Sequence, residues 1–341
     1  MRKLSAALLL GAACALSLTV MTRAREKWDP ALAAAYLDAR QEAWFAWPRA
    51  ASPNGPCISC HTGMPYLLAR PALRKVLRES APTMYETGRL KRLQSQAGAA
   101  PAGALQGTDA IFAAMFVTDA DAQRRAFEQL WALQKHDGAL NGGWQWFAAD
   151  LDPWETPPQV PYGAALGALA IGSAPAPVRD APDAQARIRA LVAYLNQELP
   201  SRPLHARIAM LWASTKLPEV MDATARRATI DEILRKQQPD GGWTLESLGP
   251  WTGHPAAPPS LTANASHPYA TGLTAYVLAL AGGRNARRPT DRALEWLRAH
   301  QDRRTGAWPA VSMNKVYPPG SMEEKFLQDA ATAFAVLALT S

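Results

Sequence analysis

The chain has 341 residues, of which 48% are apolar and 19% are charged, and its formal net charge is +7. This composition excludes an intrinsically disordered chain, and the length suffices for one large domain or two smaller ones. Three cysteines in so long a chain exclude a disulfide scaffold. Lys and Arg form no cluster, so we expect a solvated surface and no nucleic-acid partner.

The first 24 residues have the features of a secretory signal. Arg2 and Lys3 precede an apolar run over 4–21, and Ala24 supplies a small residue where charge resumes. An uncleaved anchor stays open as an alternative, because the run is almost long enough to span a bilayer. We expect cleavage near Ala24 and an exported, periplasmic protein that meets the membrane only if this segment is retained.

Between stretches rich in Pro, Gly, Ala and Ser, the remaining chain has helical periodicity. Apolar residues recur three and four positions apart, which predicts amphipathic helices over 29–46, 66–79, 108–134, 185–199, 204–213, 222–237 and 289–300. Three segments are apolar on all sides, as buried helices are: 162–172, 269–282 and 329–339. No period-two alternation runs long enough to predict a sheet, so we expect an all-α fold.

A degenerate repeat follows three of the amphipathic helices. The copies are WALQKHDGALNGGW (131–144), LRKQQPDGGW (234–243) and WLRAHQDRRTGAW (296–308). We expect the Gly to end the helix in a left-handed conformation, the Gln to bond freed backbone groups, and the Trp to fill the gap between helix pairs. A buried helix follows each copy, and this self-similarity indicates a repeat architecture.

The motif Q-x-x-D-G-G-W resembles the repeats of squalene-hopene cyclases and protein prenyltransferases. The matching residues are Gln237, Asp240, Gly241, Gly242 and Trp243, then Gln134, Asp137, Gly143 and Trp144, and then Gln301, Gly306 and Trp308. This resemblance implies an α/α toroid, with inner helices around a central cavity and outer helices around them. It covers 108–341 well and 29–93 loosely, and we expect 25–107 to belong to the same domain.

The segment 57–61 contains the motif C-x-x-C-H. After signal removal, Cys57 and Cys60 are the only cysteines, and His61 follows them directly. Two thiols at this spacing can add to the two vinyl groups of a haem, while the adjacent His reaches the iron. We therefore predict covalent haem c with His61 as the proximal iron ligand. A Cys57–Cys60 disulfide and a zinc site stay open as alternatives, although zinc lacks a second cysteine pair.

The sixth ligand of the iron is a methionine in many electron-transfer cytochromes. Met64, Met84 and Met115 lie downstream of the motif. Met64 is too near His61 in the chain to reach the opposite face of the iron, so we favour Met84. A vacant distal side, which would permit ligand binding, is the alternative.

Acidic residues near the buried helices are candidate catalysts. Squalene-hopene cyclases protonate an alkene with a D-x-D-D motif, and the nearest string here, Asp150-Leu151-Asp152-Pro153, lacks the final Asp. Glu155 precedes the buried helix 162–172, where it is either a loop carboxylate or an acid catalyst. Asp329 opens the helix 329–339 and is either an N-cap or a catalyst.

Aromatic and histidine side chains surround the predicted inner helices. Trp146, Trp154, Trp251, Tyr162 and Tyr269 line an apolar pocket or pack in the core. His254 and His267 flank a Pro-rich loop, where they are surface residues, part of a lid over the cavity, or neighbours of the haem.

These features favour an exported haem-bearing toroid in electron transfer or redox chemistry, with a redox partner protein. The central cavity is a candidate site for an apolar small molecule such as an isoprenoid. Two alternatives stay open: a cyclase- or prenyltransferase-like enzyme whose C-x-x-C is a disulfide, and a lipid-binding scaffold without haem. Whether the protein is an enzyme is left open.

Overall fold

The computed structural model describes residues 28–341 apart from 53, 100–102, 104 and 255–264. Within these ranges the chain forms helices and two isolated bridges but no strand, which confirms the all-α prediction. The predicted signal segment lies outside the described residues. No helix in the described part of the chain is long and apolar enough to cross a bilayer.

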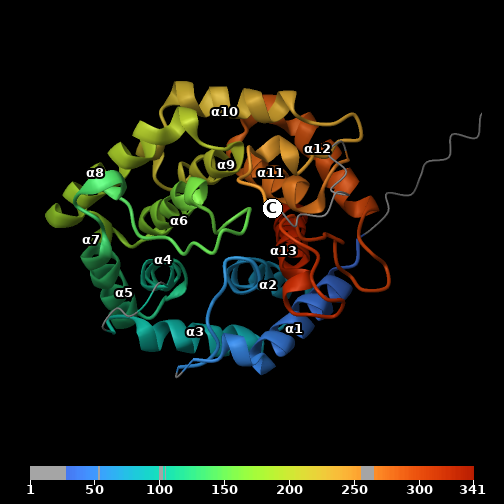
Figure 1. Ribbon diagram of the computed structural model, residues 1–341, viewed down its shortest axis with the longest axis horizontal. Helices are drawn as coiled ribbons and strands as arrows, with labels where there is room; N and C mark the ends of the chain where they lie inside the picture. Colours follow the sequence, from blue (N-terminus) through green and yellow to red (C-terminus); the bar gives the residue numbers. More distant parts are fainter. Residues whose placement is uncertain (1–27, 53, 100–102, 104, 255–264) are drawn as a thin grey trace, which may run out of the picture.

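Helices alternate along the chain between an outer and an inner ring (Figure 1). The outer helices are α1 (Pro30–Ala46), α3 (Met84–Gln96), α5 (Ala120–Leu133), α8 (Pro182–Glu198), α10 (Ala223–Arg235) and α12 (Gly283–Ala299). The inner helices are α2 (Gly63–Leu77), α4 (Gln106–Phe116), α6 (Val160–Ser173), α9 (Leu204–Ala213), α11 (Pro268–Ala281) and α13 (Phe326–Thr340). The short helix α7 (Ala176–Arg179) joins α6 to α8. The last inner helix, α13, packs against the first inner helix, α2. This contact closes the inner ring.

Small residues let the inner helices approach their neighbours closely. In α6, a Cβ on Gly163 would lie 2.1 Å from the Trp146 ring, and one on Gly167 would lie 2.7 Å from the Trp144 ring. The segments 162–172, 269–282 and 329–339 are the cores of α6, α11 and α13, and nearly all their side chains are buried. Their all-round apolar composition therefore predicted burial correctly.

The tryptophans of the repeat fill the space between helix pairs. In each copy the buried indole donates its N–H to a carbonyl in the last turn of the preceding outer helix: Trp144 to Leu130 (2.7 Å), Trp243 to Ile233 (2.8 Å) and Trp308 to Leu297 (2.7 Å). The ring thus has apolar contacts and a satisfied donor, as a buried Trp requires.

The glutamines of the repeat connect successive outer helices. Each amide donates to its own turn's glycine carbonyl and to a carbonyl at the next outer helix: Gln134 to Gly142 and Arg187, Gln237 to Gly241 and Pro289, and Gln301 to Gly306 and Asp29. Because Asp29 caps α1, Gln301 ties the last outer helix to the first.

The glycines of the repeat have a different role from the one predicted. The helix α12 ends at Ala299, before Gln301, so Gly306 does not terminate it. Gly306 has a φ of +79°, and a Cβ there would lie 2.2 Å from the Leu32 carbonyl oxygen. The position therefore requires glycine for its left-handed backbone and for close approach to α1.

Two helix predictions between residues 84 and 134 are wrong, one by joining two helices and one by omission. The segment 108–134 is two helices, because the chain turns after Phe116 and Asp119 caps α5 by accepting the Ala122 N–H (2.9 Å). Sequence periodicity also missed α3, although Thr83 and Glu86 form a capping box at its start. That four-residue signal was visible in the sequence.

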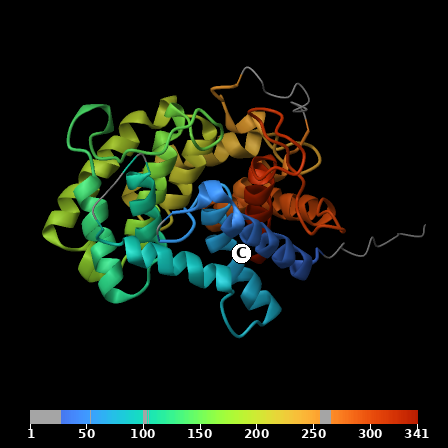
Figure 2. The same ribbon diagram turned by 60° about the horizontal axis from the view of Figure 1, so that its bottom comes forward.

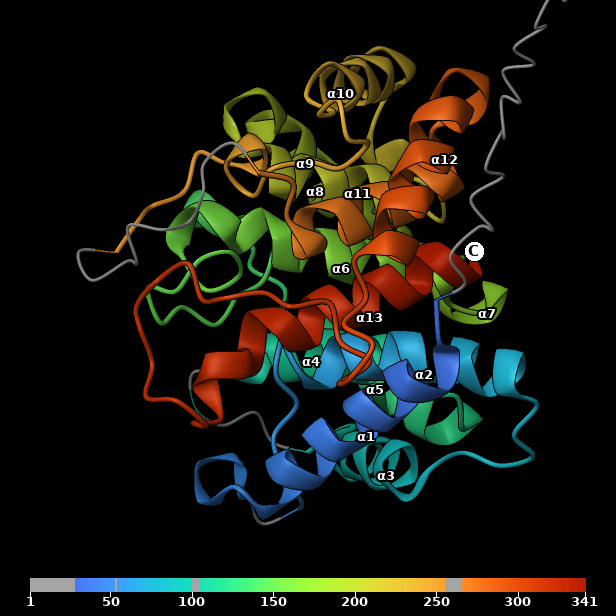
Figure 3. The same cartoon turned by 90° about the vertical axis from the view of Figure 1, so that its right-hand side faces the viewer.

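The longer connections gather on one side of the ring. Figures 2 and 3 show the green segment before α6 and the red segment before α13 on the same side. The segments that carry the candidate site residues therefore lie together, at the starts of the inner helices.

Candidate functional site

The C-x-x-C-H segment is a tightly held turn before α2. The Cys57 carbonyl accepts from Trp44 Nε1 (2.8 Å) and Arg89 Nη1 (3.3 Å), and Ser59 Oγ accepts from the first backbone N–H groups of α2. Cys57 is half-buried and Cys60 is buried, and both are free thiols. Burial raises the pKa of both thiols. No disulfide joins Cys57 and Cys60 in this structure.

His61 is held in one orientation by a relay of hydrogen bonds. Its Nδ1 lies 2.9 Å from Thr62 Oγ1, and the Thr62 hydroxyl donates to Asp329 Oδ2 (2.7 Å). Since the hydroxyl gives its proton to the carboxylate, it accepts one from His61 Nδ1. This fixes the tautomer and leaves a lone pair on Nε2, as the partners of metal-binding histidines do.

Asp329 anchors this relay from α13. Its Oδ1 accepts from Tyr36 Oη (2.7 Å) and from Arg40 Nε (2.7 Å), which come from α1. Burial raises the pKa of Asp329, and the Arg40 guanidinium opposes that rise. The N-cap alternative for Asp329 is wrong, because α13 begins at Phe326 and Asp329 lies within its first turn.

Three aromatic rings surround the His61 imidazole. Phe326 stacks on it with ring centroids 3.6 Å apart, and Trp44 and Trp154 lie 5.6 and 5.9 Å away. Burial, with a smaller effect from two arginines, lowers the pKa of His61 to about 3. The imidazole is therefore neutral at physiological pH, the state in which it ligates metals.

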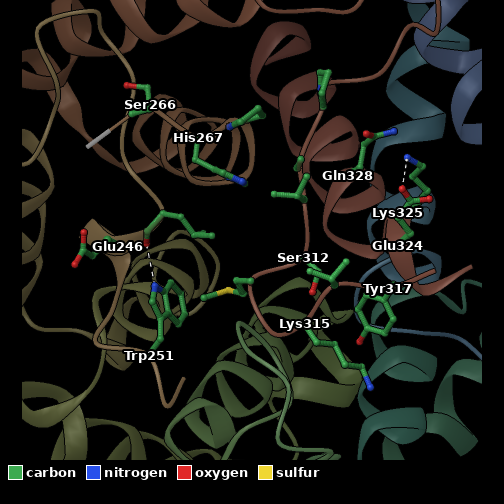
Figure 4. A pocket seen from close by; sticks show the side chains of 18 residues that line it. Glu246, Trp251, Ser266, His267, Ser312, Lys315, Tyr317, Glu324, Lys325 and Gln328 are labelled. Carbon is green, nitrogen blue, oxygen red and sulfur yellow. Dashed lines mark hydrogen bonds and ion pairs between the residues drawn. The ribbon is translucent and has the colours of Figure 1, made fainter. Parts of the chain in front are cut away.

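A small void of about 30 Å³ adjoins His61, and Glu155, Met313 and Tyr317 also line it. This space is large enough for at least one water molecule. A cavity of about 840 Å³ lies next to it, between α11, the segment 309–317 and the start of α13 (Figure 4). The two spaces share the lining residues Ser312, Met313 and Tyr317.

The donor set fits a covalent haem, because two free thiols precede an imidazole whose Nε2 is available. The void beside His61 is too small for a porphyrin by itself. The larger cavity falls within the range of about 300–1,000 Å³ that is usual for small-molecule sites. Ser312, Met313 and Tyr317 line both spaces and therefore lie between the large cavity and His61.

Met84 is not placed as a sixth ligand would be. It begins α3, and 73% of its side chain is exposed. The methionine that shares a void with His61 is Met313, which is buried. Sequence reasoning missed Met313 because it considered only methionines soon after the motif, whereas the ring brings residues 250 positions apart together.

The acidic candidates differ in their surroundings. Asp152 is buried, and its carboxylate accepts from the Thr156 hydroxyl (3.0 Å) and the Gly253 N–H (3.0 Å). It therefore holds two loops together. Glu155 is buried beside the void next to His61, and burial raises its pKa to about 7. Its raised pKa makes Glu155 a weaker acid than alkene protonation requires.

The aromatic residues named from the sequence divide between core and cavity. Trp251 lines the large cavity and Trp154 the small one, whereas Trp146, Tyr162 and Tyr269 are fully buried. His267 caps α11 by accepting the Tyr269 N–H (3.2 Å) and also lines the large cavity, as Figure 4 shows. His254 is half-buried, and most of the loop that follows it lies outside the described residues.

Sequence reasoning missed His205, at the start of α9. It is fully buried, and both ring nitrogens are hydrogen-bonded, Nδ1 to Gln159 Oε1 (2.8 Å) and Nε2 to Tyr269 Oη (2.7 Å). A histidine inside an apolar helix was the available signal. Across the described ranges, no three His, Cys, Asp or Glu side chains gather as they would around one metal ion.

No model of a known protein family matches this chain, and comparison with curated proteins gives no match either. The resemblance to squalene-hopene cyclases and protein prenyltransferases therefore stays a prediction that rests on the repeat motif.

Proposed function

We propose that this protein is an exported c-type haem protein that acts in electron transfer or redox chemistry. Cys57 and Cys60 would form the thioether bonds, and His61 would be the proximal ligand. The observation that carries the proposal is the state of His61, whose Nδ1 is engaged by Thr62 and whose Nε2 lone pair is available beside a void.

The surrounding residues support this role in three ways. The relay from Thr62 to Asp329 keeps the Nδ1 proton in place, which raises the basicity of Nε2 as a ligand. The rings of Phe326 and Trp154 pack against the imidazole, which is buried. The ion pair between Arg40 and Asp329 adds a fixed charge pair nearby, which influences the redox potential of a bound group.

When bound, haem supplies one-electron chemistry at its iron. The protein's own contribution would be to orient His61, to keep the site dry and to hold a proton on Glu155 near neutral pH. The large cavity would admit an apolar small molecule beside the site, since Leu245, Trp251 and Met313 contribute apolar walls.

The cyclase-like alternative has less support. A carbocation-forming enzyme needs a strong acid in a dry cavity, and Asp152 is instead used in structural hydrogen bonds. The scaffold alternative differs from the proposal only in the absence of haem, so a haem measurement separates them.

The test is expression of the full chain together with a haem c maturation system. We expect a Soret band, and haem that stays with the polypeptide on a denaturing gel. Cys57→Ser should weaken this attachment and Cys57→Ser with Cys60→Ser should abolish it, whereas the exposed-loop variant His136→Ala should retain it. Colourless wild-type protein from cells that mature a control cytochrome would refute the proposal.

A further inference from the structure

His267 caps helix α11 and carries a second ring nitrogen that the cap does not use. Its Nδ1 accepts the Tyr269 backbone N–H (3.2 Å). Because a backbone N–H can only donate, the proton of the neutral imidazole is on Nε2. Burial lowers the pKa of His267 to about 4, which keeps the ring neutral at physiological pH. The Nε2 atom is therefore an N–H donor.

This donor is buried and has no hydrogen-bond partner among the described residues. Buried donors are nearly always paired, because an unpaired donor loses its bonds to water without replacement. Capping alone does not require a histidine at this position, since Ser, Thr, Asp and Asn are the preferred N-cap residues. The unused N–H thus indicates a further partner, which a bound molecule can supply.

The His267 side chain lines the cavity of about 840 Å³ and faces it (Figure 4). Apolar side chains form much of the remaining wall: Leu245, Trp251, Val311, Met313 and Val316. Val311 and Val316 are among the most exposed large apolar residues of the described chain, at 58% and 76%. Exposed apolar surface that gathers at one cavity is typical of a small-molecule site.

The charged groups of the cavity wall balance one another. Lys325 lies 3.4 Å from Glu324, and the Lys315 ammonium lies 5.0 Å from the centre of the Tyr317 ring. With Glu246, the wall has two Lys and two Glu. Because these formal charges sum to zero and the imidazole is neutral, a charged ligand would gain no net compensation for the loss of its hydration. The wall therefore favours an uncharged molecule.

We propose that the large cavity binds an uncharged, mostly apolar molecule whose carbonyl oxygen accepts the His267 Nε2–H. A carbonyl suits this donor better than a hydroxyl, because a hydroxyl would bring a proton that needs an acceptor of its own in the buried site. A hydrocarbon would fill the cavity but leave the donor unpaired. Neighbouring atoms cover Nε2 in this structure, so the oxygen reaches it by a local shift of the wall. Residues 309–317 of that wall form no helix and can move without breaking one.

The proposal specifies the apolar ligand of the proposed function and rests on it in that respect, but its test needs no haem. The purified full chain is titrated with diphenylhexatriene, a hydrocarbon fluorophore, and the dye is then displaced with butyrophenone or with butylbenzene. These two probes differ only in that a methylene of butylbenzene replaces the carbonyl. We expect saturable binding of the dye and its displacement by both probes.

The variant His267→Asn separates the donor from the cap. Asparagine still accepts a backbone N–H at the start of α11, but it is too short to place a donor at Nε2. The variant should weaken butyrophenone binding roughly tenfold, which corresponds to about 1.4 kcal/mol, and leave the affinity for butylbenzene unchanged. Val316→Ser should weaken the binding of both probes. The control Val76→Ser, on an exposed valine of α2 outside the cavity wall, should weaken neither.

Infrared spectroscopy tests the hydrogen bond directly in the wild-type protein. The carbonyl stretch of bound, isotope-labelled butyrophenone should lie at lower frequency than in a hydrocarbon solvent and return toward the solvent value in His267→Asn. The proposal would be overturned by an unshifted band in the wild-type protein or by an unchanged affinity for butyrophenone in His267→Asn. Tighter binding of the anion phenylbutyrate than of butyrophenone, or no saturable binding at all, would also overturn it. Haem content, measured separately, tests the proposed function.

Discussion

Replacement of Gln301 by Ala should open the junction between the last and the first outer helices. The side chain is 4% exposed and makes three hydrogen bonds, two of them to Asp29 across the junction and one to Gly306 in its own turn. Its Nε2 donates to the Asp29 and Gly306 carbonyls at 2.9 and 3.0 Å, and its Oε1 accepts the Asp29 N–H at 2.7 Å. At about 1 kcal/mol net for each bond, the variant should lose roughly 3 kcal/mol.

Thermal unfolding of the mature chain measures this loss. For a domain of this size each kcal/mol shifts the midpoint by about 2 °C, so Gln301→Ala should lower it by about 6 °C. Proteolysis within α1 should also become faster, because Asp29 loses its tie to α12. The control is Gln94→Ala on the exposed face of α3, which should change stability by less than about 0.5 kcal/mol. A Gln301→Ala midpoint equal to that of the control would show that packing alone closes the ring.

Three other changes test particular contacts. Burial raises the pKa of Glu155 to about 7. Between pH 4.5 and 7 the folded state therefore binds more protons than the unfolded state, and the free energy of unfolding falls as pH rises through that window. Glu155→Gln should remove this fall of about 3 kcal/mol, measured by urea unfolding at pH 5 and pH 8, and an unchanged pH profile would contradict the assignment. Gly306→Ala should destabilise far more than Gly320→Ala in thermal melts, because both have φ +79° but only Gly306 lies against the backbone of α1; equal losses would show that φ strain alone matters. Thr62→Val removes two buried hydrogen bonds at nearly constant volume and should cost about 3 kcal/mol in urea unfolding, and a loss below about 1 kcal/mol would argue against the relay to His61.

Local sequence patterns predicted the helices whose burial is uniform. The segment 204–213 coincides with α9, and the three all-apolar segments are the cores of inner helices. Patterns failed where a short connection joins two apolar helices, as at Val117, and where a helix is mostly polar, as α3 is. Periodicity detects an apolar face of a helix. At Val117 the apolar pattern continues from one helix into the next without a gap, and α3 has too few apolar residues to show such a face.

For the candidate site, the sequence by itself determined the C-x-x-C-H segment, because adjacent residues remain close in any fold. It also determined the Gln and Trp of each repeat, since their bonding partners lie within one turn or at the equivalent place in the next repeat. Only the tertiary structure decided that Asp329 holds His61 through Thr62, that Met313 and not Met84 lies near it, and that His205 meets Tyr269. These contacts join residues 64 to 267 positions apart, and they arise because the starts of the inner helices converge on one side of the ring. No local spacing rule encodes such convergence.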